Sequence, residues 1–266
     1  MQIHYYKGWS DNLQREMEYK TYGHDGRVIL VFPSQDQRFY EWEDNGMIDV
    51  LAPMIEAGQI RLCCCDSIDI ETWSNGVNGE DAEVSDWEKN RYHERIELHE
   101  RWFNYIVSEL IPEVKAAWGN TNDWIVTGCS MGGYHAGNLF FRRPDLFGTL
   151  LSFSGLFNAD YFFPHYDDAL IYQNSPLDFL KGFVEPHLLI EQYRRKQIIC
   201  CCGQGNYEEI TSASNRHLEQ TLAGLGVNGW FDFWGSDVNH DFYWWRKQAA
   251  YFFGKIFGND IAALSA

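Results

Sequence analysis

The sequence predicts an α/β protein with a mostly parallel central sheet and helices on both faces. Two observations lead to this prediction. Apolar runs of strand length recur along the chain without polar alternation, and segments with helical apolar periodicity separate them. Hydrophobic residues make up 45% of the 266 residues and aromatic residues 17%, which is enough for a thick core. We expect residues 1–266 to form a single domain.

The first half of the chain supplies the start of this pattern. Residues 1–8 and 15–23 predict two antiparallel strands separated by a polar turn. Buried strands and helices then alternate: strand 27–33, helix 46–58, strand 60–67, helix 88–118 and strand 123–129. A loop rich in Ser, Asn and Gly follows strand 60–67 and extends to about residue 86. The long helix carries an apolar stripe that includes Ile96, Trp102 and Leu110.

The second half continues the alternation around one insertion. The expected elements are helix 131–143, strand 148–155, strand 197–203, helix 210–225 and strand 229–235. Residues 155–196 break the rhythm, because they are rich in aromatic residues and contain Pro164, Pro176 and Pro186. We expect this segment to be a loop-like insertion over the upper edge of the sheet.

The charge and the apolar runs argue against two classes of partner. The formal net charge of -17 repels phosphate backbones and anionic lipid surfaces, so we expect neither nucleic acid nor a membrane as a partner. No run approaches eighteen apolar residues, and residues 1–12 lack the features of a secretory signal. Assembly of the chain into a homo-oligomer stays open.

The seven cysteines indicate a reducing compartment. Six of them form consecutive triplets at 63–65 and 200–202, each within a predicted buried strand, and the seventh is Cys129. Neighbouring residues of a strand point to opposite faces, so a triplet does not readily form a disulfide within itself. No Cys or His spacing typical of zinc occurs, and we expect no metal. We interpret the cysteines as reduced core thiols of a cytoplasmic protein.

Residues 128–132, Gly-Cys-Ser-Met-Gly, indicate a nucleophile. They match the pattern G-x-S-x-G between a predicted strand and a predicted helix. In this sharp turn the serine adopts strained backbone angles that expose its hydroxyl, and the glycines avoid collisions with the neighbouring elements. Ser130 is therefore the expected nucleophile, whereas the alternative is a tight strand–helix turn without chemistry. The N–H of Met131 at the start of the helix is the expected first oxyanion donor.

The hydroxyl of Ser130 needs a base, and His240 is the histidine in the right place. It lies in a loop between the last predicted strand and the last helix, the late position that the order Ser, acid, His demands. The alternative is a histidine that only packs or caps. We interpret the adjacent Asp241 as a helix cap. A second oxyanion donor is expected after strand 27–33, at Ser34 or Gln35.

The acid should come from the loop that follows strand 197–203. Asn206 in this loop cannot carry the stabilising charge, but Glu208 and Glu209 follow it. We prefer Glu208, because Glu209 falls where the next helix begins and should face water. The alternative is that both glutamates are first-turn helix residues favoured by the dipole, and that the acid lies elsewhere.

These motifs resemble the putative-esterase family of α/β-hydrolases, which includes S-formylglutathione hydrolase (esterase D) and the antigen 85 mycolyltransferases. The residues that carry the resemblance span roughly 30 to 250: FPSQDQRFYEWED, CCCDSID, GCSMGGYHAGN, FRRPDLFG, SFSG, GQGNYEE and DVNHDFYWWRKQ. The resemblance implies an α/β-hydrolase fold, no cofactor, and a triad that includes Ser130 and His240. Many members have Asp where this chain has Asn206, while others use a Glu slightly later.

The expected activity is that of a serine esterase, which hydrolyses a small or sugar-linked carboxylic ester through an acyl-enzyme. The alternatives are an acyltransferase with the same triad and a non-catalytic binding protein on the same fold. Aromatic stretches around Trp73 and Trp244 are expected to line the substrate pocket, where they could stack a sugar ring or a phenolic group. The alternative for each of these aromatic residues is that it packs in the core.

Overall fold

The computed structural model describes residues 1–76, 78–79, 82–119 and 123–258. The predicted loop up to residue 86 includes positions 77, 80 and 81, and the predicted domain includes 259–266, all of which lie outside the described residues. None of the described helices is both long enough and apolar enough to cross a membrane.

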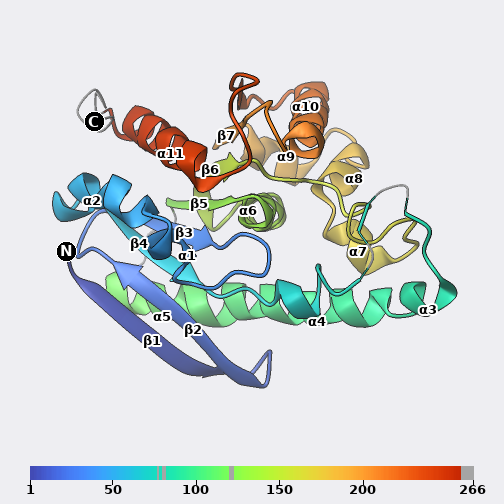
Figure 1. The fold of residues 1–266 in the computed structure, drawn as a ribbon, viewed down its shortest axis with the longest axis horizontal. Coiled ribbons are helices and arrows are strands. Elements are labelled where there is room, and N and C mark those ends of the chain that lie inside the picture. Colours follow the sequence, from blue (N-terminus) through green and yellow to red (C-terminus); the bar gives the residue numbers. More distant parts are fainter. Residues whose placement is uncertain (77, 80–81, 120–122, 259–266) are drawn as a thin grey trace.

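The described strands form one sheet in the order β1-β2-β4-β3-β5-β6-β7-β8 (Figure 1). β1 and β2 form an antiparallel hairpin, β2 pairs antiparallel with β4, and every other pairing is parallel. The strands are β1 (Ile3–Ser10), β2 (Arg15–Tyr22), β3 (Arg27–Phe32), β4 (Ile60–Cys65), β5 (Trp124–Cys129), β6 (Phe147–Phe153), β7 (Gln197–Cys202) and β8 (Trp230–Phe233). This confirms the predicted α/β class and every predicted strand.

Helices cover both faces of the sheet, because each face carries an apolar cluster of its own. The helices are α1 (Glu41–Asp44), α2 (Met47–Glu56), α3 (Asp86–Lys89), α4 (Tyr92–Tyr105), α5 (Ile111–Trp118), α6 (Met131–Arg142), α7 (Ala169–Gln173), α8 (Pro176–Lys181), α9 (Leu188–Tyr193), α10 (Glu209–Gly224) and α11 (Phe242–Phe257). α2 and α11 pack on one face and lie together at the upper left of Figure 1. The other face is covered by α4, α5, α6, α8 and α10.

The side chains of the cysteine triplets point alternately to the two faces of the sheet and pack in both apolar clusters. Cys63 and Cys65 pack on the face covered by α6, whereas Cys64 between them packs under α2 and α11. Cys200 and Cys201 divide between the two faces in the same way. All seven thiols are free and buried, and burial raises the pKa of Cys63 well above that of an ordinary thiol. The cysteines therefore act as small core residues, as the sequence predicts.

The helix predicted over 88–118 is divided. The short helix α3 ends at Lys89, and a continuous helical run begins at Tyr92. A π-helical turn, Ile106–Leu110, joins α4 to α5 within that run. Pro112 is the second residue of α5, one residue beyond this turn. It has no N–H to donate to the preceding turn and needs space for its ring, which accounts for the wider winding.

The inserted segment contains three short helices, α7 to α9, and is less loop-like than we expected. Its prolines were interpreted as interruptions, but Pro176 is the first residue of α8, a position where the missing N–H costs nothing. Asp168 caps α7 by accepting hydrogen bonds from the N–H groups of Leu170 and Ile171. A third apolar cluster joins Phe162 and Phe163 of the segment to Trp73 and to Tyr134 of α6.

Candidate active site

Ser130 lies in a strained turn at the carboxyl end of the central strand β5. β5 ends at Cys129 and α6 begins at Met131, so Ser130 alone makes the connection. Its φ of 56° and ψ of -120° are unusual for a residue with a side chain and cost about 1–3 kcal/mol. The turn directs the hydroxyl away from the strand, toward the loops that follow β7 and β8.

The two glycines of the motif are required by close backbone contacts. A β-carbon on Gly128 would lie 2.4 Å from the carbonyl carbon of Gly132, and one on Gly132 would lie 2.3 Å from the carbonyl oxygen of Phe32. Neither carbonyl belongs to a side chain that could rotate away. The glycines therefore let α6 start directly against β3 and β5, which fixes Ser130 at the sheet edge.

His240 lies beside Ser130, although 110 residues separate them in the sequence. Its Nε2 is 2.8 Å from the Ser130 hydroxyl oxygen. The ring packs edge-on against Trp245 at a centroid distance of 4.8 Å, and the backbone N–H of His240 donates to the carbonyl of Asn206. Asp241 caps α11 by accepting from the N–H of Trp244, as the sequence predicts. The imidazole is thus held between a helix start and the loop after β7.

Glu208 is the glutamate next to His240. It is completely buried, and its Oε2 lies 3.4 Å from His240 Nδ1, an ion-pair distance slightly longer than an ordinary hydrogen bond. The hydroxyl of Ser154 donates to its Oε1 at 2.6 Å, and the hydroxyl of Thr211 donates to its Oε2. Glu209 is the first residue of α10 and is exposed.

The surroundings of Glu208 favour its charged form. Burial raises the pKa of this carboxyl group, but the neighbouring His240 lowers it. The hydroxyl groups of Ser154 and Thr211 lower it further. The result is a pKa below the ordinary value, so Glu208 presents a negative charge to the imidazole at neutral pH.

The loop after β3 contains Ser34 and Gln35, the two residues at which a second oxyanion donor is expected. The backbone N–H of Ser34 donates to the Glu41 carboxylate at 2.8 Å, and the Ser34 hydroxyl donates to the same carboxylate. This N–H is therefore engaged, and the expectation for Ser34 is wrong. Gln35 lines the cavity beside Ser130 together with Met131. Glu41 lies only seven residues after Ser34, at the start of α1, but nothing in the sequence marks it as the partner of this N–H.

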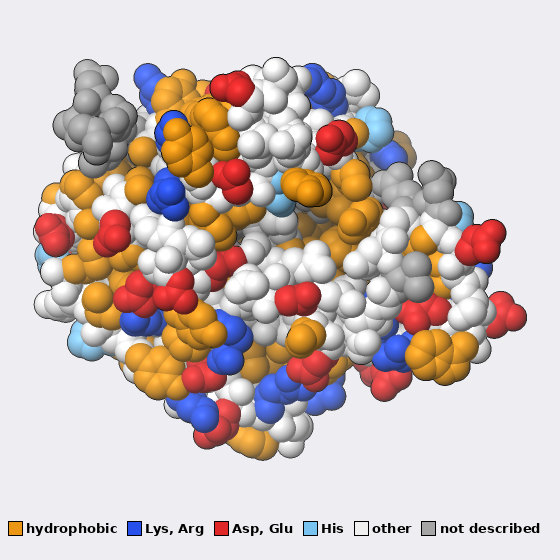
Figure 2. Space-filling view, viewed as in Figure 1, with side chains coloured by type: hydrophobic (Ala, Val, Ile, Leu, Met, Phe, Trp, Pro, Cys, Tyr) orange, Lys and Arg blue, Asp and Glu red, His pale blue; other side chains and the backbone are white. Residues whose placement is uncertain are grey.

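A cavity of about 270 Å3 lies beside Ser130. Its walls carry the aromatic side chains of Tyr161, Phe162 and Tyr207, and the aliphatic ones of Leu156 and Ile210. Figure 2 shows a hollow near the centre of the face in view, with hydrophobic side chains along much of its rim. The described residues include no group of three His, Cys, Asp or Glu side chains placed to hold a metal ion.

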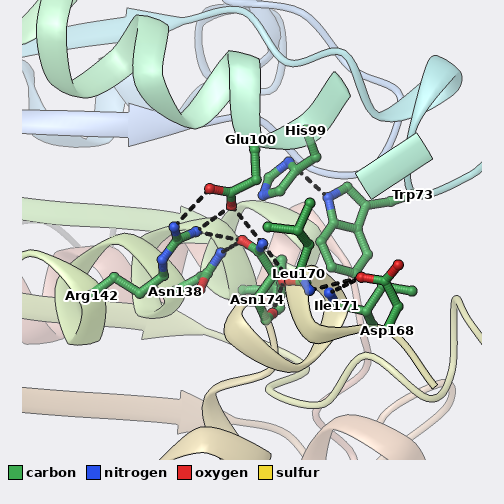
Figure 3. A network of polar contacts seen from close by, with 10 residues as sticks. Trp73, His99, Glu100, Asn138, Arg142, Asp168, Leu170, Ile171 and Asn174 are labelled. Carbon is green, nitrogen blue, oxygen red and sulfur yellow. Dashed lines mark hydrogen bonds and ion pairs between the residues drawn. The ribbon is translucent and has the colours of Figure 1, made fainter. Parts of the chain in front are cut away.

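Trp73 and Trp244, predicted as pocket residues, lie elsewhere. Trp73 is completely buried and donates its indole N–H to His99 Nδ1 at 3.0 Å (Figure 3). It packs edge-on against Phe162 and so supports the cavity wall from behind. Trp244 is half-buried on α11, beside Tyr243 and 4.7 Å from the Lys247 ammonium group. Neither tryptophan is among the residues that line the cavity. Trp73 packs in the core, as the alternative interpretation has it, whereas Trp244 lies half-buried outside the described core clusters.

Ser154 and Trp245, which contact Glu208 and His240, were not singled out in the sequence. Ser154 lies just after β6 and has a φ of 50°. Its hydroxyl donates to Glu208 and accepts the indole N–H of Trp245 at 3.1 Å. The sequence SFSG at the end of a strand is the only signal that could have found it. Trp245 adjoins Trp244 in the sequence, and only the helix phase shows which of the two faces His240.

A buried polar network fastens the inserted segment to the helix of Ser130 (Figure 3). Asn174, between α7 and α8, donates to Glu100 at 2.6 Å and accepts from Arg142 and Asn138 at 2.7 and 2.8 Å. Arg142 and Glu100 also form an ion pair. The network therefore joins α4, α6 and the insertion whose residues form one wall of the cavity.

Comparisons with known proteins assign the family. The sequence model of the family described as "Putative esterase" matches residues 72–251. No curated protein sequence matches the chain. Among solved structures, a ferulic acid esterase has a TM-score of 0.68 at 16% identity, covering 93% of this chain and 94% of the other. The fluorophosphonate-binding serine hydrolase FphF of Staphylococcus aureus has a TM-score of 0.69 at 13% identity, covering 97% and 99%.

An S-formylglutathione hydrolase from Agrobacterium tumefaciens has a TM-score of 0.67 at 13% identity and covers 93% of this chain and 91% of the other. At these identities the structures establish the α/β-hydrolase fold, and the family match extends over most of the chain. The chain belongs to the putative esterase family and is an esterase, a carboxylic ester hydrolase with the α/β-hydrolase fold.

Proposed function

We propose that this esterase acts through Ser130, His240 and Glu208 as nucleophile, base and acid. Ser130 Oγ attacks the carbonyl carbon of the ester while His240 Nε2 takes its proton. The tetrahedral intermediate collapses, the bond to the alcohol breaks, and the alcohol leaves with the proton from His240. Water then attacks the acyl-enzyme while His240 takes its proton. The bond between the acyl carbon and Ser130 Oγ breaks, His240 returns the proton to Oγ, and the carboxylic acid leaves.

One observation carries this proposal: His240 lies between a nucleophile and a charged acid. Its Nε2 is 2.8 Å from Ser130 Oγ, and its Nδ1 is 3.4 Å from Glu208 Oε2. The lowered pKa of Glu208 supports a carboxylate that stabilises the imidazolium formed when Ser130 loses its proton. The contacts of Ser154 and Thr211 with the carboxylate support a fixed orientation.

The N–H groups of Met131 and Gln35 would bind the oxyanion in this mechanism. Met131 is the first residue of α6, where an N–H has no partner within the helix. Gln35 lines the same cavity as Met131. It directly follows Ser34, whose own N–H is engaged by Glu41. Two such donors, together with the positive end of the α6 dipole, would stabilise the developing charge.

The cavity suits a small or sugar-linked ester. Its volume of about 270 Å3 holds a compact acyl or alcohol group, and the rings of Tyr161, Phe162 and Tyr207 could stack a sugar or a phenolic ring. Seven free, buried thiols support a reducing compartment, and we infer that the enzyme acts in the cytoplasm.

The test is covalent labelling with a fluorophosphonate, followed by turnover of p-nitrophenyl acetate. We expect the probe to phosphonylate Ser130, and Ser130→Ala to lose labelling and at least about 10³-fold in kcat/KM. Ser108→Ala on the exposed side of the α4–α5 run is the matched control and should keep both. Labelling that persists in Ser130→Ala, or a wild-type protein that stays unlabelled, would refute the mechanism.

A further inference from the structure

A second cavity adjoins the one beside Ser130. Its volume is about 390 Å3, and it shares Tyr161, Glu209 and Ile210 with the first cavity. Ala213 and His217, one and two turns further along α10, form part of its wall. A substrate that reaches past the shared residues would therefore enter a space larger than the one beside the nucleophile.

The shared boundary carries a single unpaired charge. Glu209 is the acidic side chain common to both cavities, and no Lys or Arg is among the described residues that line either of them. Within the described part of the chain, its carboxylate forms no ion pair. Concave surfaces focus the field of such a charge, and the net charge of -17 adds to it.

We propose that the second cavity is a substrate subsite that accepts uncharged or cationic groups and rejects anionic ones, with Glu209 as the specificity-determining residue. The subsite takes the part of the ester that extends beyond the reacting carbonyl. A cationic group would gain attraction to the carboxylate, and an uncharged group could donate hydroxyl hydrogen bonds to it. An anionic group would meet repulsion, with no Lys or Arg among the described lining residues to relieve it. This inference rests on the proposed function of Ser130.

The first experiment measures kcat/KM for two matched series of esters. In the acyl series, p-nitrophenyl esters carry a trimethylammonium, a methyl ester or a carboxylate group at the far end. In the alcohol series, acetylcholine, 2-methoxyethyl acetate and acetylglycolate are compared by acid release. We expect the cationic ester to exceed the anionic one by about tenfold or more in at least one series, and that series identifies the side that enters the subsite. Equal values in both series would overturn the proposal.

Charge reversal at Glu209 tests whether this residue is the cause. Glu209→Gln should reduce the cationic-to-anionic ratio about threefold or more, and Glu209→Lys should reverse the preference. Glu219→Lys is the matched control, because it makes the same change in net charge about 15 Å further along α10. The ratio should stay at the wild-type value in Glu219→Lys. Equal effects of the two lysine variants would show that only the net charge matters and would overturn the role of Glu209.

Filling the cavity tests whether substrates occupy it. Ala213→Trp should lower kcat/KM for the extended esters relative to p-nitrophenyl acetate by about tenfold, because the indole takes their place. Ala223→Trp, an exposed position near the end of α10, is the control and should keep the wild-type ratio. An unchanged ratio in Ala213→Trp would overturn the subsite. Failure of the subsite differs from failure of the mechanism, because only the latter abolishes Ser130 labelling.

Discussion

At the scale of single residues, the site depends on which side chains reach His240. Glu208 and Glu209 are neighbours in the sequence, yet one is completely buried beside the imidazole and the other is exposed at the cavity wall. The difference arises because Glu208 is the N-cap residue of α10 and Glu209 its first residue. Ser154 and Thr211 then bind the Glu208 carboxylate, and neither has a counterpart at Glu209.

This difference predicts unequal losses on neutralising the two glutamates. Glu208→Gln should lower kcat for p-nitrophenyl acetate by about 10³- to 10⁴-fold, because the imidazolium loses its charge partner. Glu209→Gln should lower it by less than about tenfold. Steady-state kinetics of both variants decide the matter. A larger loss in Glu209→Gln would assign the acid to that residue.

At the scale of elements, the turn between β5 and α6 fixes the position of Ser130. Helix propensity alone favours alanine over glycine by about 1 kcal/mol, and Gly132 lies inside α6. Sterics act in the opposite direction here, because a β-carbon would meet the carbonyl oxygen of Phe32 at 2.3 Å. Overpacking a fixed backbone contact costs about 1–3 kcal/mol or more, so the close approach outweighs propensity.

Two glycine-to-alanine variants test this balance. Gly132→Ala should lower the free energy of unfolding in urea by about 1–3 kcal/mol. Gly224→Ala, at the end of α10 where nothing lies within 4 Å of the new carbon, should leave stability unchanged or raise it by about 0.5–1 kcal/mol. If both variants shift the urea midpoint alike, the contact with Phe32 does not constrain the turn.

At the scale of the whole molecule, stability depends on keeping buried groups in one protonation state. His99 is buried on α4, and its Nδ1 accepts the indole N–H of Trp73 (Figure 3). This hydrogen bond requires that Nδ1 carries no proton. Burial lowers the pKa of His99 well below its usual value, and His135 and Arg142 nearby lower it further. In the unfolded chain this histidine titrates near its ordinary value of about 6.5.

The sign of the resulting pH dependence follows from proton binding. Below about pH 6.5 the unfolded chain binds a proton at His99 that the folded protein does not, so stability falls as the pH falls, by up to about 1.4 kcal/mol per pH unit. His99→Gln keeps an acceptor for Trp73 but does not titrate. Urea unfolding at pH 7 and pH 5 should therefore show a loss for the wild type that exceeds the variant's by about 2 kcal/mol. Equal losses would mean that His99 is protonated in the folded state.

Much of the fold could be predicted from the sequence, because its signals are local. A buried strand is apolar whatever it pairs with, so all eight strands were found without knowledge of their order. The inserted segment was less predictable, since the helices α7 to α9 have only five or six residues and too few turns to show periodicity. Asp168 caps α7, His187 caps α9, and the network around Asn174 holds the link between α7 and α8.

The sequence by itself determined the α/β class and the strand–turn–helix around Ser130, because backbone sterics and burial patterns act over a few neighbouring residues. It also singled out His240 through chain order. Only the tertiary structure decided that Glu208 lies next to His240 and that Trp73 packs behind the cavity rather than in it. Those outcomes depend on distances between loops that parallel strands bring to one sheet edge, and residues far apart in a chain carry no local signal of such distances.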